Sequence, residues 1–201
     1  MIRYPIQAAI FILGCCSAIS CTNKQTKDTA SIFTEVDSLT EIYLDLQDSI
    51  LVTWNLMLND DNQRIKRLHS LLHELQVIGQ IDPQELAALQ TRLKLLKETR
   101  FTPKTISDNQ LVDEYDFATN SLVAEILSLA ESHSAYSYNT TMQHLVDEIR
   151  SSEQRVEAAR ITYDSVVLAY NHFIMRHKQY MHDIDPNNSL EKKPVFQLTT
   201  E

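Results

Sequence analysis

Two histidines and a neighbouring carboxylate have the one spacing in this chain that suits a metal ion. His69 and His73 are four residues apart, and Glu74 follows the second histidine. On an α-helix this spacing brings both imidazoles to one face, where they can chelate zinc or copper. A complete site also needs a third ligand and groups that orient the imidazoles. We therefore expect a pair of partly exposed histidines on the flank of a helix, and we keep weak metal binding as an alternative.

Most other catalytic arrangements are excluded by residues that the sequence lacks. Its 2 glycines, Gly14 and Gly79, cannot build a Walker loop, a dinucleotide-binding GxGxxG or a GxSxG elbow. No Glu is followed three residues later by a His, so the Glu-x-x-His pattern of di-iron helical bundles is missing. We therefore expect a protein that is not an enzyme, with no catalytic residue, no cofactor and no small-molecule substrate.

The 3 cysteines lie in or just after an apolar, uncharged run at residues 6–19. A helix of this length reaches about 21 Å, whereas a hydrocarbon core is roughly 30 Å thick, so the run is typical of a signal peptide. Ala18-Ile19-Ser20-Cys21 resembles the box of a bacterial lipoprotein signal. This predicts cleavage after residue 20 and acylation of Cys21 with fatty acids such as palmitate. Modification of Cys15 instead, or a plain secretory signal, are the alternatives.

The charge balance limits the partners of the chain. The formal net charge is -9 and the pI is about 5.2. Nucleic acids and anionic lipid surfaces attract clustered cations, which this chain does not supply. We therefore expect no nucleic-acid partner and attachment to a membrane through the lipid anchor alone. The predicted location is the bacterial cell envelope, with the folded domain outside the cytoplasm.

Helix-forming periodicity organises the rest of the chain. Apolar residues recur at alternating steps of three and four in four segments, which indicates helices that pack along their lengths. The first extends over about 32–78, with a weak point at the polar residues 59–62, and Gly79 and Asp82-Pro83 mark a short turn after it. The short connections predict an all-α, antiparallel up-down-up-down four-helix bundle with long first and last helices.

Unequal helix lengths refine this prediction. At about 1.5 Å per residue, the first and fourth helices are about 70 and 54 Å long, and the two between them about 28 and 37 Å. The surplus length of the long helices falls at one end and predicts a two-helix stalk, with Tyr43 near Phe173. We accordingly expect a signal at 1–20, a flexible tether at 21–31, the bundle domain at 32–181 and a flexible C-terminal tail at 182–201.

A family resemblance enters through the fourth helical segment, over residues 153–174. Its offsets of acidic, basic, Tyr and Asn residues resemble the C-terminal signature of LemA-family proteins. The matching positions are Glu153, Arg155, Arg160, Tyr163, Val167, Tyr170, Asn171 and Ile174. The resemblance implies a divergent member of this family: an envelope-anchored helical bundle whose signature has no known catalytic role.

These observations together predict a binding protein. We expect a non-enzymatic, membrane-anchored LemA-like lipoprotein that presents a helical face to another envelope protein. The unusual polar cluster Arg64, Arg67, His69 and His73 is the predicted partner-binding face. A structural coiled-coil spacer or self-associating lipoprotein is the first alternative, and a weak periplasmic metal binder that uses His69 and His73 is the second.

Overall fold

The computed structural model describes residues 34–196 and is all-helical. In this part of the chain 79% of the residues are helical and none lies in a β-strand. The elements are α1 (Glu35–Ile78), α2 (Pro83–Glu98), α3 (Asn109–Ser132), the 3-10 helix η1 (Tyr136–Tyr138), α4 (Thr140–Arg176) and α5 (Met181–Ile184). The all-α prediction is confirmed, whereas the predicted signal peptide, the tether and Cys21 lie outside the described residues. Between residues 34 and 196, none of the helices combines the length and apolar character that a bilayer span requires.

The helix ends follow local capping chemistry. The Thr34 hydroxyl accepts a bond from the amide of Asp37, whose carboxylate accepts one from the Thr34 amide. The Thr34 hydroxyl also donates to the Asp37 carboxylate, and this bond, together with the one from the Thr34 amide, holds the pKa of Asp37 below its usual value. Gly79, at a φ of +79°, caps the end of α1, and Asp82 caps the start of α2, as predicted, while Asp108 caps the start of α3. The expected weak point at 59–62 does not interrupt α1.

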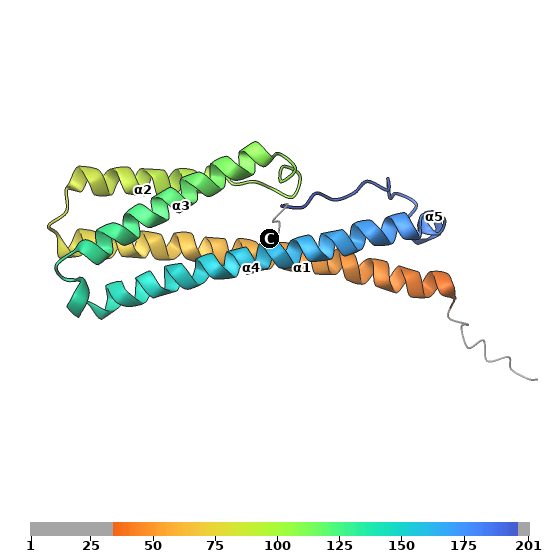
Figure 1. Cartoon of the computed structure of the whole chain (residues 1–201), viewed down its shortest axis with the longest axis horizontal. Coiled ribbons are helices and arrows are strands. Elements are labelled where there is room, and N and C mark those ends of the chain that lie inside the picture. Colours follow the sequence, from red (N-terminus) through yellow and green to blue (C-terminus); the bar gives the residue numbers. More distant parts are fainter. Residues whose placement is uncertain (1–33, 197–201) are drawn as a thin grey trace, which may run out of the picture. The chain divides into compact units, whose positions relative to one another are not determined.

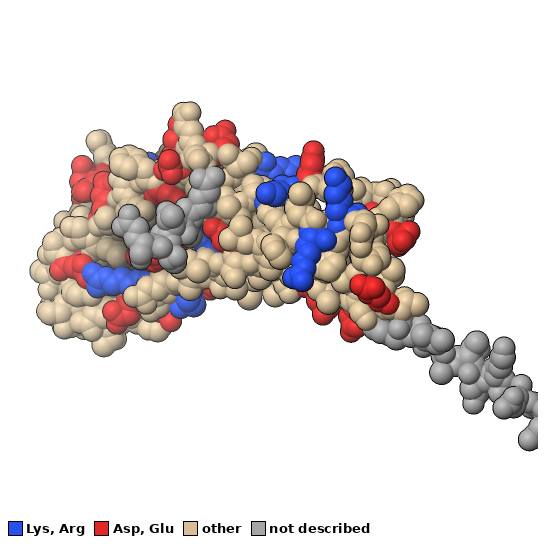
Figure 2. Space-filling view, turned by 45° about the vertical axis from the view of Figure 1, so that its right-hand side comes forward, with Lys and Arg blue, Asp and Glu red and all other residues tan. Residues whose placement is uncertain are grey.

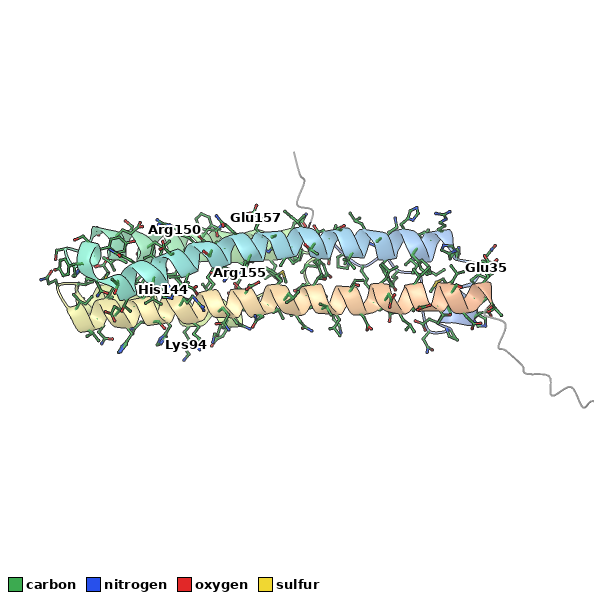
Figure 3. All side chains as sticks on the ribbon, turned by 90° about the horizontal axis from the view of Figure 1, so that it is seen from below. Glu35, Lys94, His144, Arg150, Arg155 and Glu157 are labelled. Carbon is green, nitrogen blue, oxygen red and sulfur yellow. The ribbon has the colours of Figure 1, made fainter. Side chains whose placement is uncertain are left out.

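The two long helices, α1 and α4, lie side by side in opposite directions (Figures 1 and 3). Near one end, the rings of Tyr43 and Phe173 have centroids 6.2 Å apart. Near the other end, the side-chain amide of Asn139, which precedes α4, donates a 2.9 Å hydrogen bond to the Glu74 carboxylate. Residue numbers therefore increase along α1 in the direction in which they decrease along α4, so the two helices are antiparallel. The predicted register, with Tyr43 beside Phe173, is confirmed.

Helices α2 and α3 cover the half of the α1–α4 pair that ends at Ile78 (Figure 1). The central core contains apolar residues that belong to the three-and-four patterns of α1, α2 and α4, including Leu68, Leu72, Leu89, Leu93, Met142 and Ile149. In α3 the sequence pattern predicts a seam that includes Tyr115, Ala118 and Leu122, but the structure buries Thr119 and exposes Ala118. A helix that packs against several neighbours buries a wider stripe than a two-helix seam, so strict heptad spacing misplaces such positions.

The chain after α4 differs from the flexible tail that we expected from residue 182. Residues 185–196 lie along the other half of the α1–α4 pair (Figure 1). The Lys193 amide donates a 2.8 Å hydrogen bond to the Asn171 side chain, and the Phe196 amide donates one of 2.8 Å to Asp164. The Phe196 ring stacks on Trp54, with centroids 6.2 Å apart. This segment is extended and has no apolar periodicity, which explains why the sequence pattern did not reveal its packing.

Candidate functional site

The four residues of the predicted partner-binding face have three different surroundings. Arg64 is buried, with 5% of its surface exposed, and pairs with Asp61. Arg67 forms an ion pair with Glu148 of α4. This bond from Arg67 is the main reason that the pKa of the Glu148 carboxyl is lowered. His69 and His73 are exposed and face α2. The structure therefore does not bring the four residues together on one face.

A groove between α1 and α2 contains the two histidines. Its volume is about 1080 Å³, and its floor includes the buried side chains Ile65 and Leu93. The Lys94 side chain projects outward from the helices (Figure 3). The lining consists of Asn62, Gln63, Ile65, Lys66, His69, Ser70, His73, Gln76, Gln90, Leu93, Lys94 and Lys97. We call this surface the α1–α2 groove.

The lining of the α1–α2 groove contains no acidic residue among the residues that the structure describes. It contains three lysines, Lys66, Lys94 and Lys97, although the chain has a formal net charge of -9. On the face drawn in Figure 2, acidic and basic side chains are interspersed with neutral ones. A groove lined by positive charges without acidic neighbours attracts acidic ligands. Its apolar floor favours a partner that also has an apolar side.

The histidine pair does not gain a third metal ligand in the groove. His69 and His73 have lysines, amides and a serine as their neighbours in the lining. Across residues 34–196, no group of three or more His, Cys, Asp and Glu side chains is arranged to hold a metal ion. The arrangement instead suits hydrogen bonding and electrostatic attraction to acidic groups.

A buried charge network centred on Asp61 was not predicted from the sequence. The Asp61 carboxylate pairs with Arg64 and with Arg100 at 2.6 Å, and it accepts a 2.8 Å hydrogen bond from the Tyr115 hydroxyl. Burial and the Asp61 charge together raise the pKa of Tyr115. Two guanidinium groups share one carboxylate, so the network carries one surplus positive charge. A useful signal is that Asp61 occupies an inward position of α1, four residues after Met57 and four before Ile65.

Two arginines of the LemA-like signature bind acidic residues of other helices. Arg160 holds Asp116 of α3 through two hydrogen bonds, of 2.6 and 2.7 Å. Its guanidinium also lies 5.1 Å from the ring centroid of Phe101 and 5.0 Å from that of Phe196. Arg155 donates a 3.1 Å hydrogen bond to Asp60 of α1. Both side chains tie α4 to neighbouring elements.

The tyrosines and the asparagine of the signature, like its arginines, contribute to the packing of the fold. Tyr163 is buried, and burial raises its pKa to about 12. The Tyr170 hydroxyl accepts a 3.0 Å hydrogen bond from Asn188, and Asn171 bonds to the backbone of Lys193. Glu153 is partly buried and makes no hydrogen bond or ion pair within residues 34–196. Apart from Glu153, these signature residues contact other parts of the same chain.

Comparisons with known proteins do not identify a function for this chain. No protein-family model, curated protein or solved structure matches this chain. The LemA-like positions therefore enter the structural argument only through their packing contacts. The α1–α2 groove has the most distinctive combination of size, charge and apolar floor, and it is the candidate functional site.

Proposed function

We propose that this chain is a non-enzymatic LemA-like lipoprotein whose helical bundle binds another protein of the bacterial envelope through the α1–α2 groove. The observation that carries the proposal is the acid-free, lysine-lined wall of this groove in an acidic chain. The partner segment is an acidic amphipathic helix. Its apolar side contacts Ile65 and Leu93, and its carboxylates approach the lysines, a common way in which helical peptides are recognised.

The fold that we propose for this binding module is an antiparallel up-down-up-down four-helix bundle. The opposite directions of α1 and α4 support it, as does the short connection at residues 79–82. The Arg92–Glu125 ion pair joins α2 to α3, and the bond from His133 to the Gly79 carbonyl joins the ends of α1 and α3. Short links between sequential helices favour this arrangement.

The proposed anchor is a diacylated Cys21, which attaches the module to a membrane through its acyl chains. Metabolic labelling with palmitate tests the anchor. We expect the label in the full chain and in a Cys15→Ala variant, and its loss in Cys21→Ala. Label that persists in Cys21→Ala and disappears in Cys15→Ala assigns the modification to the rival cysteine.

Binding in the groove is tested with a defined probe. A fluorescent, acidic amphipathic helical peptide is titrated with the full chain in detergent, and anisotropy reports binding. We expect binding that is lost in a Lys66→Glu, Lys97→Glu double variant and retained in a Lys178→Glu control, whose changed residue lies on an exposed position after α4. Equal binding of a lysine-for-glutamate version of the peptide, or no effect of the double variant, contradicts the proposal.

A second candidate, a self-associating coiled-coil spacer, is favoured by one observation. Ile161, Leu168 and Met175 recur every seven residues on α4 and are 43%, 57% and 50% exposed. Apolar side chains at this spacing are typical of helix seams. Light scattering on the full chain in detergent, corrected for the micelle, distinguishes the two candidates. A monomer at all concentrations excludes the spacer, and a dimer lost in Leu168→Glu supports it.

A further inference from the structure

A second concave site, separate from the α1–α2 groove, lies between α3 and α4. These helices diverge with distance from the turn that joins them (Figure 1). The cleft has a volume of about 510 Å³, which is within the range of small-molecule sites. Its lining consists of Arg64, Asp116, Asn120, Arg150, Glu153, Gln154, Val156, Glu157 and Arg160. We call this surface the α3–α4 cleft.

A buried arginine with spare hydrogen-bonding capacity forms part of the cleft. Arg64 comes from α1, is 5% exposed and lines the cleft between the walls provided by α3 and α4. Its Nε has no hydrogen-bond partner within the described part of the chain. The carboxylate that it contacts, Asp61, also neutralises Arg100. A buried guanidinium without full compensation is unfavourable, so this position favours an anionic group.

The α4 wall of the cleft presents two carboxylates without ion pairs. Glu153 is partly buried, and neither it nor Glu157 takes part in an ion pair within residues 34–196. Arg150 and Glu157 project from the same edge of α4 (Figure 3). Burial raises the pKa of Glu153, although Arg64 and Arg150 oppose this shift. Such a carboxylate gains most from a bound cation, because it has lost water contacts without gaining a partner.

We propose that the α3–α4 cleft binds a small zwitterion, a molecule that carries a carboxylate and an ammonium group a few bonds apart, such as a free α-amino acid. The ligand carboxylate accepts from Arg64, and the ammonium donates to Glu153. A simple anion is repelled by the carboxylates Glu153 and Glu157, which have no ion pair within residues 34–196, and a simple cation is repelled by Arg64. The other two arginines of the lining, Arg160 and Arg150, are already paired with Asp116 and Glu131. A zwitterion satisfies both sets, because charge-assisted hydrogen bonds form at each end.

Calorimetry on the full chain in detergent tests the ligand class. The probes are glycine, leucine, phenylalanine, glutamate and arginine, with acetate and methylammonium as probes that carry a single charge. We expect saturable heat from at least one amino acid, and affinity that is at least roughly tenfold weaker for both single-charge probes, since each lacks one charge-assisted interaction. No saturable heat from any amino acid, or acetate that binds as tightly as the best of them, overturns the proposal.

Matched glutamate variants test the position of the site. Glu153→Gln removes the charge but keeps the side-chain shape, and it breaks no hydrogen bond within the described residues. We expect this variant to bind the amino acid that has the highest affinity for the unmodified chain roughly tenfold more weakly. Glu41→Gln, at an exposed position of α1, is the control and leaves the affinity unchanged. Unchanged affinity in a folded Glu153→Gln variant, as judged by circular dichroism, overturns the proposal without bearing on the α1–α2 groove.

Discussion

The Tyr43 hydroxyl of α1 donates a 2.6 Å hydrogen bond to Asp185, which lies 142 residues later in the chain. Asn188 adds bonds of 2.8 Å to the Tyr43 hydroxyl and 3.0 Å to that of Tyr170. Burial and the Asp185 carboxylate raise the pKa of Tyr43, so its hydroxyl remains a donor at neutral pH. These contacts hold residues 185–196 against the part of α1 and α4 that α2 and α3 do not cover.

Tyr43→Phe is expected to loosen the C-terminal segment while α1 and α4 stay folded. The change removes the donor to Asp185 and an acceptor for Asn188, at a cost of about 1 kcal/mol in the free energy of unfolding. Hydrogen exchange of the amides at 193 and 196 should become faster. Tyr138→Phe is the control, because Tyr138 is 75% exposed and its loss should change neither measurement. Exchange rates that match the unmodified chain would contradict the proposed role of Tyr43.

Phe196→Ala is expected to lower the free energy of unfolding by about 3 kcal/mol. The ring stacks on Trp54 at an interplanar angle of 9° and meets Phe101 and Tyr163 edge-on, at centroid distances of 5.2 and 5.6 Å. Urea unfolding followed through Trp54, the single tryptophan of the chain, gives this quantity directly. Phe117→Ala provides the control, since Phe117 is 78% exposed and should cost almost nothing. Equal midpoints for the two variants would show that Phe196 does not contribute to the core.

Helix positions and one long-range register could be predicted from the sequence because both follow from periodicity. The seams of α1 and α4 are long enough to fix their direction and length, and the short turn at Gly79 orients α2. The Tyr43–Phe173 contact then follows from helix lengths alone. Contacts that repeat along a regular helix can therefore be predicted from the sequence.

The buried network and the C-terminal packing could not be predicted, because they depend on single contacts between distant residues. The sequence places Arg64 and Arg67 together on the predicted partner-binding face, but a helix turns by about 100° per residue, and only Arg64 points toward Asp61 and the core. Asp61 belonged to a polar stretch that suggested a weak point, whereas its charge is neutralised by Arg100, 39 positions later. Periodicity contains no information about either pairing.

Asp61→Asn is expected to destabilise the fold strongly, by about 3–5 kcal/mol. The change leaves the buried Arg64 and the partly buried Arg100 without a countercharge, and the amide cannot accept from both guanidinium groups and Tyr115 as a carboxylate does. Asp60→Asn is a control on the adjacent residue. Asp60 pairs with Arg155, whose side chain is 46% exposed, so this loss should be below about 1 kcal/mol. Thermal or urea unfolding of the two variants should therefore differ clearly, and similar values would contradict the buried charge network.

Two glutamates of α4 are expected to affect stability in opposite directions as pH changes. Burial raises the pKa of Glu153 above its usual value of 4.5, so its contribution to stability is complete below 4.5 and is lost as pH rises through the folded pKa. Arg67 lowers the pKa of Glu148, so that contribution is present above 4.5 and is lost as pH falls through the folded value. Glu153→Gln should therefore stabilise the chain at pH 7, and Glu148→Gln should destabilise it.

The Glu153→Gln difference should shrink as pH falls through the raised folded pKa of Glu153 toward 4.5, because glutamine resembles a protonated glutamate. The Glu148→Gln difference should shrink as pH falls from 4.5 toward the lowered folded pKa of Glu148. Urea unfolding of the two variants and the unmodified chain at pH 7 and at pH 4 measures this change. A Glu153→Gln variant that is less stable at pH 7 would show that the ionised carboxylate has a favourable partner, and would contradict the open α4 wall of the cleft.

Binding of an acidic helical peptide to the α1–α2 groove is expected to depend strongly on salt. Lys66, Lys94 and Lys97 are on the rim of a groove open to solvent, and the screening length falls from about 10 Å at 0.1 M salt to about 3 Å at 1 M. Affinity should therefore fall with added sodium chloride, and replacing the three lysines by glutamine should both weaken binding and flatten its salt dependence. Replacing Lys178 and Lys192, which lie outside the groove lining, should leave the slope unchanged. If the salt dependence of the affinity is unchanged by the triple substitution, the groove contributes no charge to binding and the peptide binds elsewhere on the chain.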